Sequence, residues 1–192
     1  MSADLKPWAL AQGEGFSIKH CFVRQMAKTR KEGNIVAGNT LLEGKEILIV
    51  DDEPDVLETL KELLPMCRVK GVGSFEKAKE LLETEHFDMA ILDIMGVDGY
   101  RLLKIANSRA VIAVMFTAHA LTPENVFKSY EEGAASYIPK DEMANIAAFL
   151  TDVLEAKNKG KDPWWRWLER FGSFFTERFG PDWRDNYKEF WT

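Results

Sequence analysis

Short apolar runs alternate with longer amphipathic stretches through the middle of the chain. The runs are too short for buried helices and suit strands that are buried on both faces. They lie at 47–50, 69–72, 89–92, 111–116 and 137–138. Between them, apolar residues recur every three or four positions, which predicts amphipathic helices. The alternation predicts an α/β fold, with a five-stranded parallel sheet and helices between successive strands.

Start signals help to place the predicted helices. Pro54 can occupy the first position of one helix, and Ser74 and Thr122 can cap the N-termini of two others. Asp141 is expected to open the fifth helix. The third helix, near residues 100–106, is predicted to be the shortest of the five.

Four of the predicted strands end in polar residues with reactive side chains. Asp51 and Asp52 follow the first strand, and Asp93 follows the third. Thr117 ends the fourth strand, and Lys140 follows the fifth. Because the carboxyl ends of parallel strands meet at one sheet edge, where open α/β folds bind ligands, we expect these side chains to converge.

The converging acids predict a Mg²⁺ site. Three neighbouring carboxylates repel one another at neutral pH, and hard oxygen ligands with open positions suit Mg²⁺. The Lys140 ammonium and the Thr117 hydroxyl can contact a phosphoryl group, a combination that suits phosphoryl transfer. Asp93 is the natural nucleophile and would form an aspartyl phosphate, with Asp51 and Asp52 mainly metal ligands. Taken alone, the acidic pair also fits a simple helix-capping role.

These residues resemble the receiver domain of two-component response regulators, a CheY-like family. The resemblance covers about residues 45–157 and rests on residue types, their order and their positions at strand ends. It is carried by Asp51-Asp52, Asp93, Thr117-Ala118 and Lys140. The resemblance implies a doubly wound, flavodoxin-like sheet with strand order 2-1-3-4-5.

The resemblance also implies the roles of individual residues. Asp93 would accept a phosphoryl group from a partner histidine kinase or phosphotransfer protein, with Mg²⁺ as cofactor. Besides the three acids, the backbone carbonyl of Met95 would bind the metal. Thr117 and Lys140 would contact the phosphoryl group, and Thr117 and Tyr137 would act as the switch residues.

The predicted function is that of a stand-alone receiver that catalyses only its own phosphorylation and dephosphorylation. It would signal through protein–protein contacts. A receiver-like scaffold that is not regulated by phosphorylation is an alternative. A Mg²⁺-dependent, aspartate-based phosphohydrolase is a remote one, because that class usually carries its nucleophile on an early strand, as Asp-x-Asp.

An aromatic tail follows the predicted receiver. Residues 161–192 carry 11 of the 22 aromatic side chains. Apolar residues at three- and four-residue steps predict an amphipathic helix that starts after Asp162-Pro163 and ends at Gly180-Pro181, followed by a second short helix. The side chains predicted to contact a partner are Trp164, Trp167, Leu168, Phe171, Phe175 and Trp183.

An apolar stripe of this size is unusual on the surface of a monomer, so something should cover it. One cover is the chain's own receiver. A second is a partner protein or another copy of the chain, since amphipathic helices commonly dock into grooves. A membrane surface is the third, although the tail's zero net charge gives no attraction to anionic lipid.

The composition narrows the class of protein. With 192 residues, a net charge of −6 and 46% hydrophobic residues, the chain is not fully disordered, and its acidity disfavours nonspecific nucleic-acid binding. Cys21 and Cys67 cannot make a disulfide framework. The absence of a long apolar run and of a signal-peptide core predicts a cytoplasmic protein. We expect an N-terminal extension (1–44), a receiver (45–159) and a helical tail (160–192).

Overall fold

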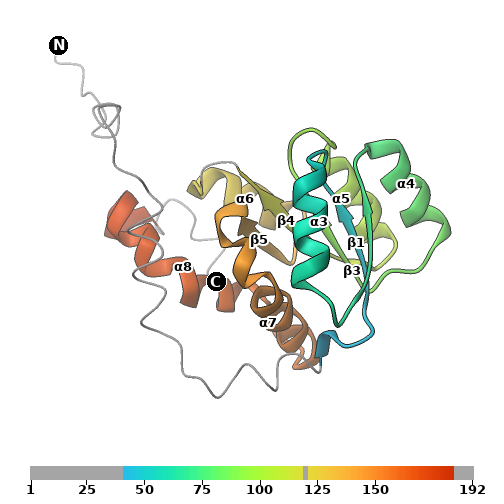
Figure 1. Cartoon of the computed structure of the whole chain (residues 1–192). Helices are drawn as coiled ribbons and strands as arrows, with labels where there is room; N and C mark the ends of the chain where they lie inside the picture. Colours follow the sequence, from blue (N-terminus) through green and yellow to red (C-terminus); the bar gives the residue numbers. More distant parts are fainter. Residues whose placement is uncertain (1–40, 119–120, 184–192) are drawn as a thin grey trace, which may run out of the picture. The chain divides into compact units, whose positions relative to one another are not determined.

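A five-stranded sheet forms the centre of the molecule (Figure 1). The computed structural model of the protein describes residues 41–118 and 121–183, which belong to one compact unit, Asn34–Thr192. The strands are β1 (Glu46–Val50), β2 (Arg68–Val72), β3 (Met89–Leu92), β4 (Ile112–Thr117) and β5 (Ser136–Pro139). All are parallel, in the order β2-β1-β3-β4-β5, which confirms the predicted fold class and strand order.

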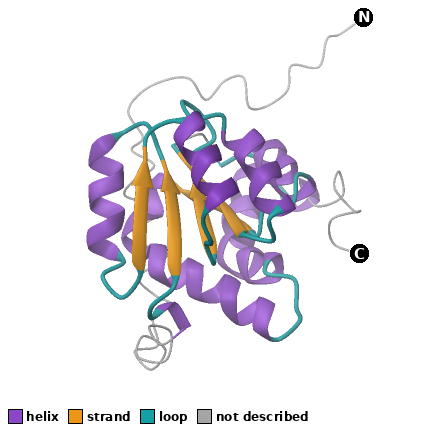
Figure 2. Ribbon diagram, turned by 90° about the vertical axis from the view of Figure 1, so that its right-hand side faces the viewer, coloured by secondary structure: helices purple, strands orange, loops and turns teal. Residues whose placement is uncertain are grey.

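Helices cover both faces of the sheet (Figure 2). They are α3 (Pro54–Leu63), α4 (Phe75–Thr84), α5 (Gly99–Ser108), α6 (Pro123–Glu131) and α7 (Ile146–Asn158). The helix α3 contacts α7, and α4 contacts α5. Since β1 and β3 are covered on both sides, residues 47–50 and 89–92 are at most 1% exposed, as their continuous apolar runs predict. In the part of the chain that the structure describes, no helix combines the length and apolar character needed to cross a membrane.

Two predictions about the helices are wrong. The helix α5 is not the shortest, because its ten residues equal those of α3 and α4 and exceed the nine of α6. Its first residue is Gly99, whose missing side chain lets the helix begin directly against the loop after β3. Asp141 does not open α7, because the 3-10 helix η2 (Lys140–Asn145) precedes it. The buried Glu142 accepts a hydrogen bond from the Asn145 side chain at 2.8 Å, which holds this tighter turn together.

The aromatic tail forms α8 (Trp164–Phe179), with the predicted ends. In Figure 1 it is the red helix beside β5 and α7, and it contacts both elements. Five of the six side chains predicted to contact a partner are buried within this chain, and Leu168 is half-buried. The structure therefore shows the tail covered by its own receiver, one of the three expected covers, and contact of these side chains with a partner stays a prediction. Beyond a short turn at 181–183, the predicted second helix lies outside the described residues.

Two indole groups attach α8 to the edge of the sheet. Trp164 Nε1 donates a hydrogen bond to the Ala134 carbonyl, and Trp167 Nε1 donates one to the Tyr137 carbonyl, both at 2.8 Å. The strand β5 is an edge strand, and such a strand presents backbone groups that have no neighbouring strand to pair with. The tail helix satisfies one acceptor of this strand, the Tyr137 carbonyl, and the Ala134 carbonyl just before it, while it buries its aromatic side chains.

This attachment predicts that Trp167→Phe lowers the free energy of unfolding by about 1–3 kcal/mol. The substitution removes the indole N–H and leaves the carbonyl of buried Tyr137 without this hydrogen-bond donor, which costs free energy. Trp165→Phe is the matched control, because the indole nitrogen of half-buried Trp165 has no hydrogen-bond partner in the described structure. Urea unfolding followed by circular dichroism measures both effects. Equal losses in the two variants would contradict a specific role for the Trp167 hydrogen bond.

Candidate functional site

The carboxyl ends of β1, β3, β4 and β5 bring together the polar residues expected there. Carboxylate oxygens of Asp51, Asp52 and Asp93 lie within 4.8 Å of one another. Lys140 Nζ lies 2.7 Å from Asp51 Oδ2 and 3.7 Å from Asp93 Oδ1. Thr117 is buried at the end of β4, the strand next to β5. Side chains up to 89 positions apart in the chain thus share one edge of the sheet.

The three acids have the chemistry of a Mg²⁺ site. Asp51 and Asp93 are buried, whereas Asp52 is exposed, so one side of the cluster is open to solvent. Hard carboxylate oxygens beside an open side suit Mg²⁺, which keeps several waters in its coordination shell. The mutual repulsion of three close carboxylates also favours a bound cation. The residues present therefore fit the predicted metal.

Two glycines that we did not single out from the sequence shape the loop after Asp93. Gly96 has a φ of +64°, and a Cβ atom there would lie 2.4 Å from the Asp52 carboxylate. A Cβ atom at Gly99 would lie 1.9 Å from the Asp93 carbonyl oxygen. Their signal in the sequence is their position three and six residues after Asp93, where the backbone must approach the acids closely.

Met95 lies in the same loop, with its side chain 54% exposed. Its carbonyl oxygen accepts a hydrogen bond from the Val97 backbone N–H. A carbonyl oxygen has two lone pairs, so this bond leaves one available. The role of the Met95 carbonyl as a metal ligand stays a prediction.

The environment of Asp93 makes its carboxyl group less acidic than usual. Burial raises the pKa of Asp93 to about 6; the Lys140 ammonium opposes this shift, and the Asp51 carboxylate adds to it. The group is therefore mostly ionised at pH 7 but is close to its titration range. A cation bound among the acids would favour the ionised form, which is the nucleophilic one.

Lys140 is held by two acids other than Asp93. Its ammonium lies 2.7 Å from Asp51 and 2.8 Å from Glu53 Oε1. Burial by itself would lower the pKa of Lys140, but the contacts with Asp51 and Glu53 raise it above its ordinary value. Glu53 was not predicted as a site residue. Its signal in the sequence is its position two residues after Asp51, at the start of α3.

Tyr137 lies between the site and the tail helix. Its ring is fully buried, and its hydroxyl has no hydrogen-bond partner in the described part of the chain. Burial raises the pKa of Tyr137 well above its ordinary value, and nearby Tyr100 and Asp93 raise it further, so the hydroxyl is neutral. The carbonyl of the same residue accepts the Trp167 indole hydrogen bond. One residue of β5 therefore lies within the electrostatic influence of Asp93 and is hydrogen-bonded to the tail helix.

Sequence comparison identifies proteins that are related to this chain. A family model described as the response regulator receiver domain matches residues 47–150, more than half of the chain. The two-component response regulators ARR12 and ARR18 of Arabidopsis thaliana are 31% and 34% identical over 142 and 113 residues. The alignments cover 68% and 54% of this chain but only 24% and 18% of those proteins. The chain thus matches only about a quarter or less of the length of these relatives.

Solved structures share the fold. A CheY-like receiver domain protein from Methanospirillum hungatei has a TM-score of 0.55 and 27% identity, and the match covers 62% of this chain and 99% of that one. The response regulator DrrB of Thermotoga maritima has a TM-score of 0.52 and 27% identity, with 62% and 55% covered. The matching family model and the common strand order show that this chain belongs to the response regulator receiver family.

Proposed function

We propose that this protein accepts a phosphoryl group on Asp93 from a partner histidine kinase or phosphotransfer protein, in the presence of Mg²⁺. The observation that carries the proposal is the acid cluster, with Asp51, Asp52 and Asp93 within 4.8 Å and the Lys140 ammonium beside them. The chemistry is confined to the chain's own Asp93, so we expect no turnover of a separate substrate. The output is contact with other proteins.

Each residue of the site has a step in this transfer. A carboxylate oxygen of Asp93 forms the new O–P bond as the donor's P–N bond breaks and the donor histidine leaves. Mg²⁺, held by the three acids, would neutralise charge on the phosphoryl oxygens. Lys140 and Thr117 would contact phosphoryl oxygens with their ammonium and hydroxyl groups, which stabilises the charge that develops during transfer.

The strand β5 is the route by which phosphorylation would reach the tail. Lys140 follows β5 directly, and its ammonium is closer to Asp51 and Glu53 than to Asp93. Contact with a phosphoryl group on Asp93 would draw the ammonium away from Glu53 and shift the end of the strand. Tyr137 lies three residues earlier and accepts the Trp167 hydrogen bond. Phosphorylation would therefore alter an equilibrium between two arrangements of β5 and α8.

If Asp93 accepts a phosphoryl group, the mass of the intact protein should rise by one phosphoryl group after incubation with acetyl phosphate and Mg²⁺. This rise is the phosphoryl increment. Asp93→Asn should show none, because the amide is not a nucleophile of this kind, and chelation of Mg²⁺ should strongly reduce the wild-type increment. Asp98→Asn is a matched control on the same loop and should keep the increment, since Asp98 is exposed and binds Arg101 rather than the acid cluster. Failure of the wild type with acetyl phosphate and with a cognate kinase would favour the scaffold alternative.

The raised pKa of Asp93 predicts a pH-dependent stability. An aspartate ionises near pH 4 in the unfolded chain and at about 6 in the folded one, so folding is disfavoured once Asp93 is charged. In metal-free buffer, Asp93→Asn should raise the free energy of unfolding by about 1–3 kcal/mol above pH 7. The gain should grow between pH 4 and 6 and vanish near pH 3.

Urea unfolding at a series of pH values measures this difference between Asp93→Asn and the wild type. Asp141→Asn removes an exposed carboxylate and is expected to have little effect at any pH. Mg²⁺ should stabilise the wild type and narrow its difference from Asp93→Asn, because the metal binds the ionised acids. A gain in Asp93→Asn that is the same at pH 3 and pH 8 would contradict the assignment.

The β5 route predicts a tryptophan fluorescence response to beryllofluoride with Mg²⁺, a phosphoryl mimic. Four of the six tryptophans lie in or next to α8, and none lies within residues 45–160. We expect a change in emission in the wild type and none in Asp93→Asn. Trp167→Phe should lose most of the change, whereas Trp165→Phe should keep it. Protection of Asp93 from phosphorylation would show that beryllofluoride binds. If it binds but leaves the emission unchanged, the tail does not take part in the switch.

A further inference from the structure

The surface beneath α8 is shaped to hold one particular helix. We call it the helix-binding face; it is formed by α6, β5 and α7 and by Ala134 before β5. Its two backbone acceptors, at Ala134 and Tyr137, meet indole donors that stand three residues apart on α8, at Trp164 and Trp167. This spacing places both indoles on one side of a helix, so the donors match the acceptors as a set.

Aromatic side chains extend this match along the helix. Tyr130 of α6 packs edge-on against Trp164 with ring centroids 5.7 Å apart. Phe149 of α7 stacks on Phe171 at 5.8 Å. Phe171 and Phe175 of α8 are fully buried. The face therefore contributes aromatic rings as well as backbone acceptors to the binding of α8.

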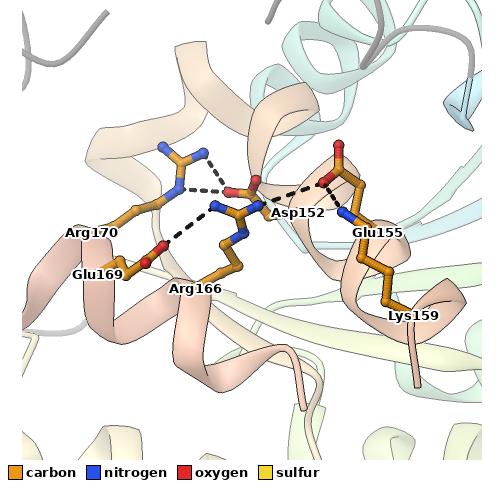
Figure 3. A network of polar contacts seen from close by, with 6 residues as sticks. All are labelled: Asp152, Glu155, Lys159, Arg166, Glu169 and Arg170. Atoms are coloured by element: carbon orange, nitrogen blue, oxygen red, sulfur yellow. Dashed lines mark hydrogen bonds and ion pairs between the residues drawn. The ribbon is translucent and has the colours of Figure 1, made fainter. Parts of the chain in front are cut away.

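Opposite charges line the boundary between α7 and α8 (Figure 3). Arg170 Nε lies 2.7 Å from Asp152 Oδ2, and Arg170 Nη2 bonds the same oxygen. Arg166 Nη2 lies 3.7 Å from Glu155 Oε2. The acids belong to α7 and the arginines to α8, so the face and its helix are complementary in charge.

The segment between α7 and α8 lies exposed on the surface. Residues 157–162 are all exposed. Gly160 has a φ of +63°, and a Cβ atom there would meet no other atom within 4 Å. A different backbone conformation there would break the local hydrogen bonds that end α7, from the Gly160 and Lys161 N–H groups, but no side-chain contact at Gly160. Residues 159–162 can therefore act as a hinge.

Opening of this hinge would expose two large apolar surfaces at once, the buried side of α8 and the helix-binding face. Such patches are rarely left uncovered in water. A second copy of the chain offers the same two surfaces, and exchanging identical elements remakes every contact without any new interaction. We propose that the helix-binding face joins two copies of this chain, with the α8 of each copy bound to the face of the other. The arrangement of β5 would set how often α8 opens, and this regulation rests on the proposed function. The exchange of α8 between copies does not rest on it.

The charges along α7 and α8 provide a selective test. A basic-α7 variant carries Asp152→Arg and Glu155→Arg, and an acidic-α8 variant carries Arg166→Glu and Arg170→Asp. Within either variant alone, α7 and α8 carry like charges, whether α8 binds its own face or that of an identical copy. In an exchanged pair of one copy of each variant, both contacts join opposite charges. The chain with all four substitutions restores opposite charges both within one copy and between identical copies, as in the natural chain.

Light scattering after size-exclusion chromatography gives the outcome. We expect the equimolar mixture to show twice the 21.9 kDa mass of one chain. Each variant alone should show the mass of one chain at the same concentration, whereas the chain with all four substitutions should form dimers to the same extent as the natural chain. A mixture that keeps the mass of one chain would overturn the proposal, as would either variant forming dimers alone as readily as in the mixture.

A second comparison guards against variants that fail to fold. Circular dichroism must first show cooperative unfolding of each chain. If a double variant fails this check, the single substitutions Asp152→Arg and Arg170→Asp give the same test with a smaller charge change. Because no step uses phosphorylation, an unphosphorylated mixture that dimerises supports the exchange even if Asp93 accepts no phosphoryl group. A phosphorylated mixture that stays monomeric refutes the exchange alone.

Discussion

Mutual repulsion among three close carboxylates is the constraint that the rest of this structure accommodates. Holding Asp51, Asp52 and Asp93 within 4.8 Å costs free energy in the absence of a cation. The fold offsets part of that cost with the Lys140 ammonium, which pairs with Asp51 and lies near Asp93. Burial, with the remaining repulsion from Asp51 and Asp52 as a smaller cause, raises the pKa of Asp93 to about 6. The site is thus prepared for added positive charge, and Glu53 holds the lysine close to it.

The strand β5 connects this electrostatic centre to the tail through only four residues. Lys140 follows its carboxyl end, and the Tyr137 carbonyl holds Trp167. Because β5 lies at the edge of the sheet, it is paired with a neighbouring strand on one side only, and α8 contacts its other side. A small shift at Lys140 therefore has a short path to α8, with no further helix needed as an intermediate. Under the proposed function, the position of the tail at this edge would make it respond to a change at the site.

Much of the sheet and of the candidate site could be predicted from the sequence, because both depend on local patterns. Continuous apolar runs identify doubly covered strands, and the polar residue after each run marks the shared edge. The length of α5 could not be read in this way, because it depends on the close approach of Gly99 to the Asp93 backbone. The contact of Glu53 with Lys140 joins residues 87 positions apart, so the place of Glu53 after Asp51 indicates that it lies near the site but not that it holds the lysine. Periodicity showed which side of α8 is apolar but not what covers it.

The order of aromatic residues along α8 shows that the helix is adapted to the face it binds. Trp164 and Trp167, in its first turn, are the residues that meet backbone carbonyls, and only tryptophan among apolar aromatic side chains supplies a nitrogen donor there. Phe171 follows where α8 packs on Phe149, a ring that offers no hydrogen-bond acceptor of this kind. Trp165 points elsewhere, and its indole nitrogen has no partner in the described structure. Where α8 meets the face, at Trp164, Trp167 and Phe171, donors thus stand opposite acceptors and a plain ring opposite a ring, and this correspondence holds whether the face belongs to the same chain or to another copy.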